Sequence, residues 1–74
     1  MDVTARIEGL RRYLIHSEPY TEVYYSYPAD PDTIHQTRLA TPDLPDDLAV
    51  GDDVVIYSIL GVVAEIRKVS GATT

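Results

Sequence analysis

The sequence predicts an all-β fold, a small five-stranded barrel with one short helical turn. Apolar and polar residues alternate with the two-residue period of a strand, and all 5 prolines lie between residues 19 and 45, where they limit helix formation. A chain of 74 residues has room for one domain. We expect this domain to cover residues 1–70, with a flexible tail over 71–74. A barrel is expected because closure would remove unpaired sheet edges. The alternative topology is an oligonucleotide-binding (OB-type) barrel.

The first predicted strand covers residues 3–15 and contains a glycine. Apolar residues occupy every second position up to Ile7, whereas after Gly9 they continue at Leu10 and Leu14. A glycine at which the alternation slips by one position indicates a β-bulge or a sharp bend. We therefore expect the strand to change its buried face at Gly9.

Two further strands are expected over residues 21–27, which are rich in tyrosine, and over residues 33–39. The prolines and aspartates at 28–32 are typical of a hairpin loop between them. Tyr20 and Tyr24 share one face of the tyrosine-rich strand, where they could form an aromatic contact for a protein segment or a flat ligand. The alternative is that one pair of tyrosines lies in the core and the other on an ordinary surface.

The segment 41–50 is the one place where the sequence allows a helical turn, which Pro45 could start. A tight turn at Gly51, where a positive φ is tolerated, then leads into a strand over residues 54–60. Gly61 marks a second reversal before the last strand, which we expect over residues 62–69.

The region around this turn resembles five-stranded barrels of the Src-homology-three and KOW type. The resemblance covers about 20 residues and implies the barrel fold without assigning a function. It rests on the pattern Leu-x-Val-Gly-Asp-x-Val-x-Ile over residues 48–56, followed by Gly-Val-Val over 61–63. KOW-type modules that bind RNA usually present basic loops, whereas the turn at residues 51–53 is acidic.

Charge is unevenly distributed along the chain. The formal net charge is −6, and residues 16–53 carry nine carboxylates against a single basic residue, Arg38. Phosphate recognition needs clustered basic side chains, so we expect neither nucleic acid nor a membrane as partner. The alternative hypothesis is a nucleic-acid-binding barrel whose first and last strands assemble a local patch. That patch would consist of Arg11, Arg12, Arg67 and Lys68.

The sequence contains no pattern typical of an active site. It has no cysteine and two histidines, His16 and His35, and Ser17 would point away from His16 if both lay in a strand. The aspartates at 43–53 do not have the spacing of a calcium loop. We therefore expect no enzyme activity, no cofactor and no metal. No segment resembles a signal peptide or a transmembrane helix, so we expect a cytoplasmic protein.

The segment over residues 54–63 contains no charged side chain. A strand places alternate side chains on opposite faces. If Val54, Ile56 and Leu60 face the barrel interior, a second apolar set faces outward. We predict that this outward set is an interface made of Val55, Tyr57, Ile59 and Val63.

Two alternatives could explain how the second apolar face is covered. The chain's own loop around Leu44 and Leu48 could cover it, or another chain could do so, most simply in a two-fold homodimer. We favour the second alternative because the loop is short and a small domain gains core from a partner. The preferred hypothesis is a structural or adaptor module that self-associates or docks on a protein partner.

Overall fold

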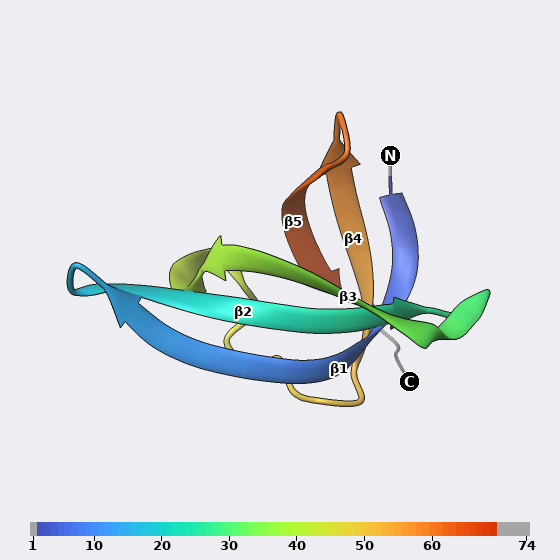
Figure 1. Ribbon diagram of the computed structural model, residues 1–74, viewed down its shortest axis with the longest axis horizontal. Coiled ribbons are helices and arrows are strands. Elements are labelled where there is room, and N and C mark those ends of the chain that lie inside the picture. Colours follow the sequence, from blue (N-terminus) through green and yellow to red (C-terminus); the bar gives the residue numbers. More distant parts are fainter. Residues whose placement is uncertain (1, 70–74) are drawn as a thin grey trace.

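The fold is a single antiparallel sheet (Figure 1). The computed structural model describes residues 2–69, and the predicted tail at 71–74 lies outside them. The order of the strands across the sheet is β3-β2-β1-β4-β5, so the predicted all-β fold with one short helical turn is confirmed. The elements in chain order are β1 (Asp2–Ile15), β2 (Glu18–Tyr27), β3 (Asp30–Ala40), the 3-10 turn η1 (Thr41–Asp43), β4 (Asp53–Ile59) and β5 (Val62–Lys68).

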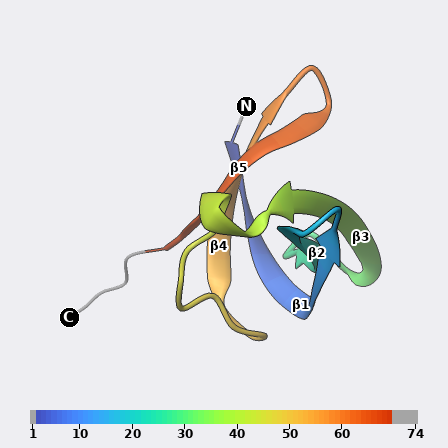
Figure 2. The same ribbon diagram turned by 90° about the vertical axis from the view of Figure 1, so that its left-hand side faces the viewer.

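The sheet is strongly bent and open. Strands β1, β2 and β3 run along the length of the molecule, whereas the β4–β5 hairpin stands away from them (Figures 1 and 2). Within residues 2–69 the two edge strands, β3 and β5, do not pair with each other. The predicted closure into a barrel is therefore not shown.

A β-bulge allows β1 to take part in both halves of the sheet. Its residues 2–6 pair with β4, and its residues 6–15 pair with β2. Ile7 lies opposite Tyr25 and Gly9 lies opposite Tyr24, so the residue between them has no partner of its own. The bulge predicted at Gly9 is confirmed.

Beyond the bulge, the predicted pattern of burial holds for one of the two leucines. Leu10 packs against the core. Leu14 is 70% exposed, because it lies near the end of the β1–β2 hairpin, past the reach of the other core elements. The core itself comes from all parts of the chain except β3 and consists of Ala5, Ile7, Val23, Tyr25, Leu44, Leu48, Val54, Ile56 and Ile66.

The helical turn lies earlier than the sequence predicted. The 3-10 turn begins at Thr41, with a proline in its first two positions, and the hydroxyls of Thr41 and Thr21 are 2.8 Å apart, which ties the turn to β2. Pro45 instead begins a hydrogen-bonded turn in which the Leu48 amide donates to its carbonyl, 3.3 Å away. A proline accommodates either type of turn, so its presence alone could not locate the helical one.

The hairpin between β2 and β3 is tighter than predicted. Tyr27 already pairs with Asp30, so β3 begins inside the expected loop and includes Pro31. An edge strand tolerates proline because its outer amides need no partner in the sheet. The register then shifts between Tyr25 and Tyr27, and His35 lies opposite Tyr25.

We expect Gly9→Val to destabilise the fold by about 1–3 kcal/mol, the usual range for overpacking. A Cβ at residue 9 would lie 3.3 Å from Cδ2 of Tyr24, and valine adds two methyl groups to that carbon. The φ angle of Gly9 is not positive, so crowding rather than backbone strain is the cause. Chemical denaturation measures the change, and most of it should disappear in a Tyr24→Ala background. An equal cost in both backgrounds would contradict this explanation.

Candidate functional site

The four predicted interface residues lie on two different surfaces: Val55 and Tyr57 on the outer face of β4, and Ile59 and Val63 along one groove on the core side of the sheet. Val55 and Tyr57 lie on the outer face of β4, and both are half-buried. Ile59, at the end of β4, is 67% exposed. Val63 packs against the core on the inner face, because an irregularity in the β4–β5 pairing leaves Ala64 without a partner and shifts β5 by one residue. The structure therefore does not bring these four side chains onto one surface.

The outer face of β4 is bordered by charged side chains. The Arg67 guanidinium lies 5.5 Å from the centre of the Tyr57 ring, and its Nε donates to Glu65 Oε2 at 2.6 Å. This hydrogen bond raises the pKa of Arg67. The loop residues Leu44 and Leu48 belong to the core on the inner face, so they do not cover this outer face.

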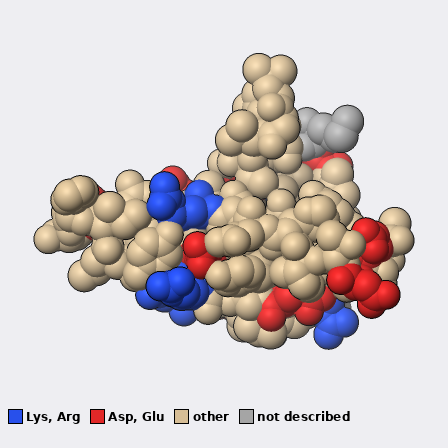
Figure 3. Space-filling view, viewed as in Figure 1, with Lys and Arg blue, Asp and Glu red and all other residues tan. Residues whose placement is uncertain are grey.

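The tip of the β4–β5 hairpin carries the most exposed apolar side chains. We define the hairpin tip as residues 59–62, in which Leu60 is 98% exposed while Ile59 and Val62 are each 67% exposed. Figure 3 shows the projecting hairpin without a basic or acidic group on the visible face. Leu60, expected in the interior with Val54, instead points into solvent.

Leu60 also adopts an unfavourable backbone conformation. Leu60 and Gly61 form the two-residue turn between β4 and β5, with φ of 53° and 79°. Hairpin turns with two positive φ values prefer Asn-Gly or Asp-Gly, and the left-handed conformation costs roughly 1–2 kcal/mol for residues other than glycine. The leucine therefore brings strain to the isolated chain and gains almost no burial in return.

An open groove lies beside the hairpin tip, on the core side of the sheet. We call it the hairpin groove; its volume is about 760 Å³. All five strands contribute to it, and none of its lining residues carries a carboxylate, an ammonium or a guanidinium group. The lining consists of Val3, Tyr25, Tyr27, His35, Ser58, Ile59, Leu60, Gly61 and Val63.

Three rings pack together on one side of the hairpin groove. Tyr25 stacks on His35, with 5.5 Å between the ring centres, and Tyr27 lies 4.8 Å from His35. Burial raises the pKa of Tyr25 to about 12, and a hydrogen bond with Tyr27 adds to the effect. Nothing in the sequence singles out His35 as a site residue. His35 lies opposite Tyr25, next to the shift in the β2–β3 register, and no simple sequence pattern indicates this shift.

Tyr20 and Tyr24 lie on the opposite face of β2, as predicted, and both interact with charged neighbours. The Arg38 guanidinium lies 5.7 Å from the Tyr20 ring centre. The Tyr24 hydroxyl donates to Glu22, which lowers the pKa of Glu22, and Arg11 approaches the same carboxylate at 3.6 Å. These rings form a mixed surface, and Figure 3 shows basic and acidic groups close together over β1 to β3.

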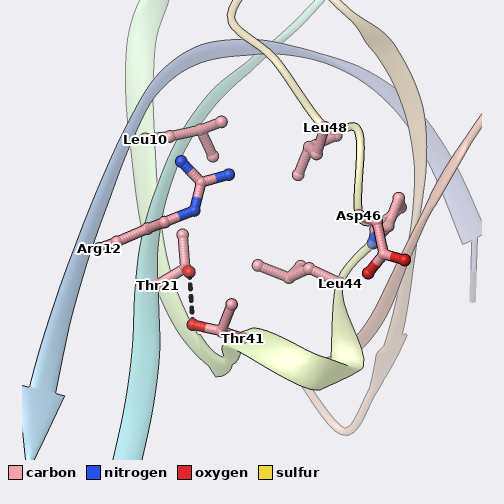
Figure 4. Close-up of a pocket in the computed structure, with 8 residues that line it drawn as sticks. Leu10, Arg12, Thr21, Thr41, Leu44, Asp46 and Leu48 are labelled. Carbon is pink, nitrogen blue, oxygen red and sulfur yellow. Dashed lines mark hydrogen bonds between the residues drawn. The ribbon is translucent and has the colours of Figure 1, made fainter.

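The four predicted basic residues do not form one patch. Arg11 and Arg12 are neighbours in β1, so they point to opposite faces, and Arg12 lines a pocket of about 90 Å³ at the other end of the core (Figure 4). Arg67 lies on the outer face of β5, whereas Lys68 contacts Asp47 Oδ2 at 3.1 Å. Arg67 and Lys68 lie in β5, which β4 separates from β1 in the sheet, so the two pairs are not on neighbouring strands.

The histidines and carboxylates of the described residues do not gather into a metal-binding cluster. Among residues 2–69 no group of three or more His, Asp and Glu side chains could hold a metal ion. His16 and Ser17 form the turn between β1 and β2, with φ of 48° and 67°. No helix in residues 2–69 is long and apolar enough to cross a membrane.

Comparison of the chain with protein-family models, curated proteins and solved structures found no match. The function therefore has to be inferred from the hairpin tip, the hairpin groove and the charged surfaces around them.

The raised pKa of Tyr25 predicts a dependence of stability on alkaline pH. In the unfolded chain this phenol ionises near its ordinary value of 10.0, whereas the folded chain keeps the proton until about pH 12. The stability that Tyr25 contributes is fully present below pH 10 and is lost as the pH rises through 12. The free energy of unfolding should therefore fall more steeply in this range for the wild type than for Tyr25→Phe. Equal slopes would contradict the burial of this hydroxyl.

Proposed function

We propose that this chain is a non-catalytic interaction module that self-associates through its β4–β5 hairpin. The observation that carries the proposal is Leu60, an apolar side chain that is 98% exposed at a φ of 53°. Strain that nothing in the isolated chain offsets is typical of residues kept for a function. A partner that buries Leu60 would offset that strain.

Self-association also fits the size and the open form of the domain. A chain of this length has a small core and stability that is correspondingly marginal. The uncharged segment 54–63 has a high β-propensity, and such a segment is prone to aggregate if it stays exposed. Closure of the single-chain barrel that the sequence predicted would protect the edges of β3 and β5. In the homodimer that we propose, the second copy supplies part of this edge protection.

Nucleic-acid binding, the alternative function, is less well supported. Its four basic residues are distributed over separate faces, and Glu65 and Asp47 lie against two of them. The surface around Tyr20 and Tyr24 contains Arg11 and Arg38. Glu22 pairs with both of them in the sheet, so a carboxylate lies between the two arginines. Nucleic-acid stacking surfaces normally accompany a continuous cationic groove.

The decisive variant is Leu60→Asn. Asparagine adopts positive φ far more readily than leucine, so the variant should fold at least as well as the wild type. It should nevertheless weaken self-association by roughly tenfold or more, because a central apolar contact is removed. Analytical ultracentrifugation over a range of concentrations measures the association, and the melting temperature of the wild type should rise with concentration.

Leu14→Asn is the matched control. Leu14 is also highly exposed and lies near the turn between β1 and β2, so the same substitution there should leave self-association unchanged. A monomeric wild type with a melting temperature independent of concentration would refute the proposal. So would equal association of the wild type and Leu60→Asn.

We also expect generic single-stranded and duplex DNA to bind weakly at physiological salt. The net charge of −6 opposes phosphate, and the scattered basic side chains allow only a few contacts, which gives a shallow salt dependence. A fluorescence-anisotropy titration measures both quantities. Submicromolar affinity with a steep salt dependence would favour the nucleic-acid hypothesis over self-association.

A further inference from the structure

We infer that the hairpin groove is the receptor for the hairpin tip of a second copy, so that two chains exchange their tips around a two-fold axis. This inference rests on the proposed self-association and specifies its contact surfaces. It differs from the interface expected from the sequence, which placed the contact on the outer face of β4.

The first reason is chemical. The hairpin groove and the hairpin tip are both uncharged, although the chain contains 12 acidic and 6 basic residues. Two copies of a protein with a net charge of −6 repel each other, and contact is least unfavourable where neither surface carries a charge. Burial of an apolar side chain between apolar and aromatic residues is also the main favourable term in association.

The second reason is the position of the tip beside its own groove. Ile59, Leu60 and Gly61 belong to the tip and also line the groove. The tip and the groove therefore form one continuous patch. A two-fold interface uses the same patch of both subunits, so the tip of each copy can meet the groove of the other. Leu60 does not fill its own groove, since it remains 98% exposed.

The third reason is that this end of the core is uncovered. At the opposite end the segment that joins β3 to β4 covers the core with its own buried side chains, Leu44 and Leu48. At the groove end Val3 remains 40% exposed, although it lies opposite the buried Ile56 in the sheet. A hairpin tip from a second copy would cover Val3 and the rings around His35, as the loop does at the other end.

The other surfaces of the molecule are less suited to this role. The pocket at the closed end is small and contains Arg12 and Asp46. The surface around Tyr20 and Tyr24 carries the Arg11–Glu22 ion pair and the Arg38 guanidinium over the Tyr20 ring. The outer face of β4 is bordered by Arg67 and Glu65. A second copy would have to desolvate charge at each of them.

The experiment uses one substitution in each half of the contact. Val3→Lys places a cation in the groove, and Leu60→Asp places an anion on the tip, where aspartate tolerates positive φ. Thr4→Lys is the matched control, because the adjacent residue of β1 points to the other face and is exposed. Circular dichroism establishes that each variant folds, and sedimentation velocity measures its association.

Each substitution in the groove or on the tip should weaken self-association by roughly tenfold or more, because both contacts of the homodimer then bury an unpaired charge. Thr4→Lys should associate like the wild type. An equimolar mixture of Val3→Lys and Leu60→Asp should regain a dimer. In the mixed dimer the wild-type tip of the Val3→Lys chain meets the wild-type groove of the Leu60→Asp chain. The second contact pairs the introduced aspartate with the introduced lysine.

The remaining outcomes separate this inference from the proposed function. If Leu60→Asp is monomeric while Val3→Lys associates like the wild type, the hairpin contributes to association but the groove is not its receptor. If both variants are monomeric and their mixture is monomeric too, tip exchange is refuted and a tip-to-tip contact replaces it. A monomeric wild type would refute both proposals.

Discussion

The bend of β1 at Gly9 is the constraint on which the rest of the fold depends. One strand of 14 residues serves as the partner of β4 in its first part and of β2 in its second part. The bulge allows this because one residue without a partner lets the strand turn between the two ladders. The backbone of Ile7 also joins the segment before β4, where its amide donates to the Asp52 carbonyl at 2.9 Å and its carbonyl accepts from the Gly51 amide at 2.8 Å. Without the bend, the β4–β5 hairpin could not stand away from β2 and β3.

The same bend produces an asymmetry between the two ends of the core. The segment that joins β3 to β4 crosses one end and is held there by the Thr21–Thr41 hydroxyl pair and by the contact of Lys68 with Asp47. The surface contact with Lys68 adds little stability, so the buried leucines of this segment provide most of its attachment. No described segment covers the other end, where the hairpin groove opens. Both proposals arise from this difference, since a covered end needs no partner and an open apolar end does.

The sequence was sufficient to predict what depends on local pattern. The alternation before Gly9, the tyrosine-rich strand, the positive φ of Gly51 and the reversal at Gly61 follow from strand period and turn chemistry, and the structure contains all of them. The groove was not predictable, because it depends on register irregularities between β2 and β3 and between β4 and β5. A shift of one residue moves a side chain to the other face, which is why Val63 lies elsewhere than expected. Leu60 lies elsewhere because β4 ends at Ile59 and Leu60 belongs to the turn.

Edge protection would allow the proposed association to stop at two copies. The free edge of β3 begins with Asp30, Pro31 and Asp32, and charges and prolines prevent strand addition at an edge. The second half of β5 carries Glu65, Arg67 and Lys68, whereas its first half, residues 62–64, has no such protection. The unprotected stretch therefore begins in the hairpin tip, at Val62. A two-fold exchange uses the tip and the groove of each copy and leaves neither free, while the protected edge of β3 provides no second site from which a fibre could grow.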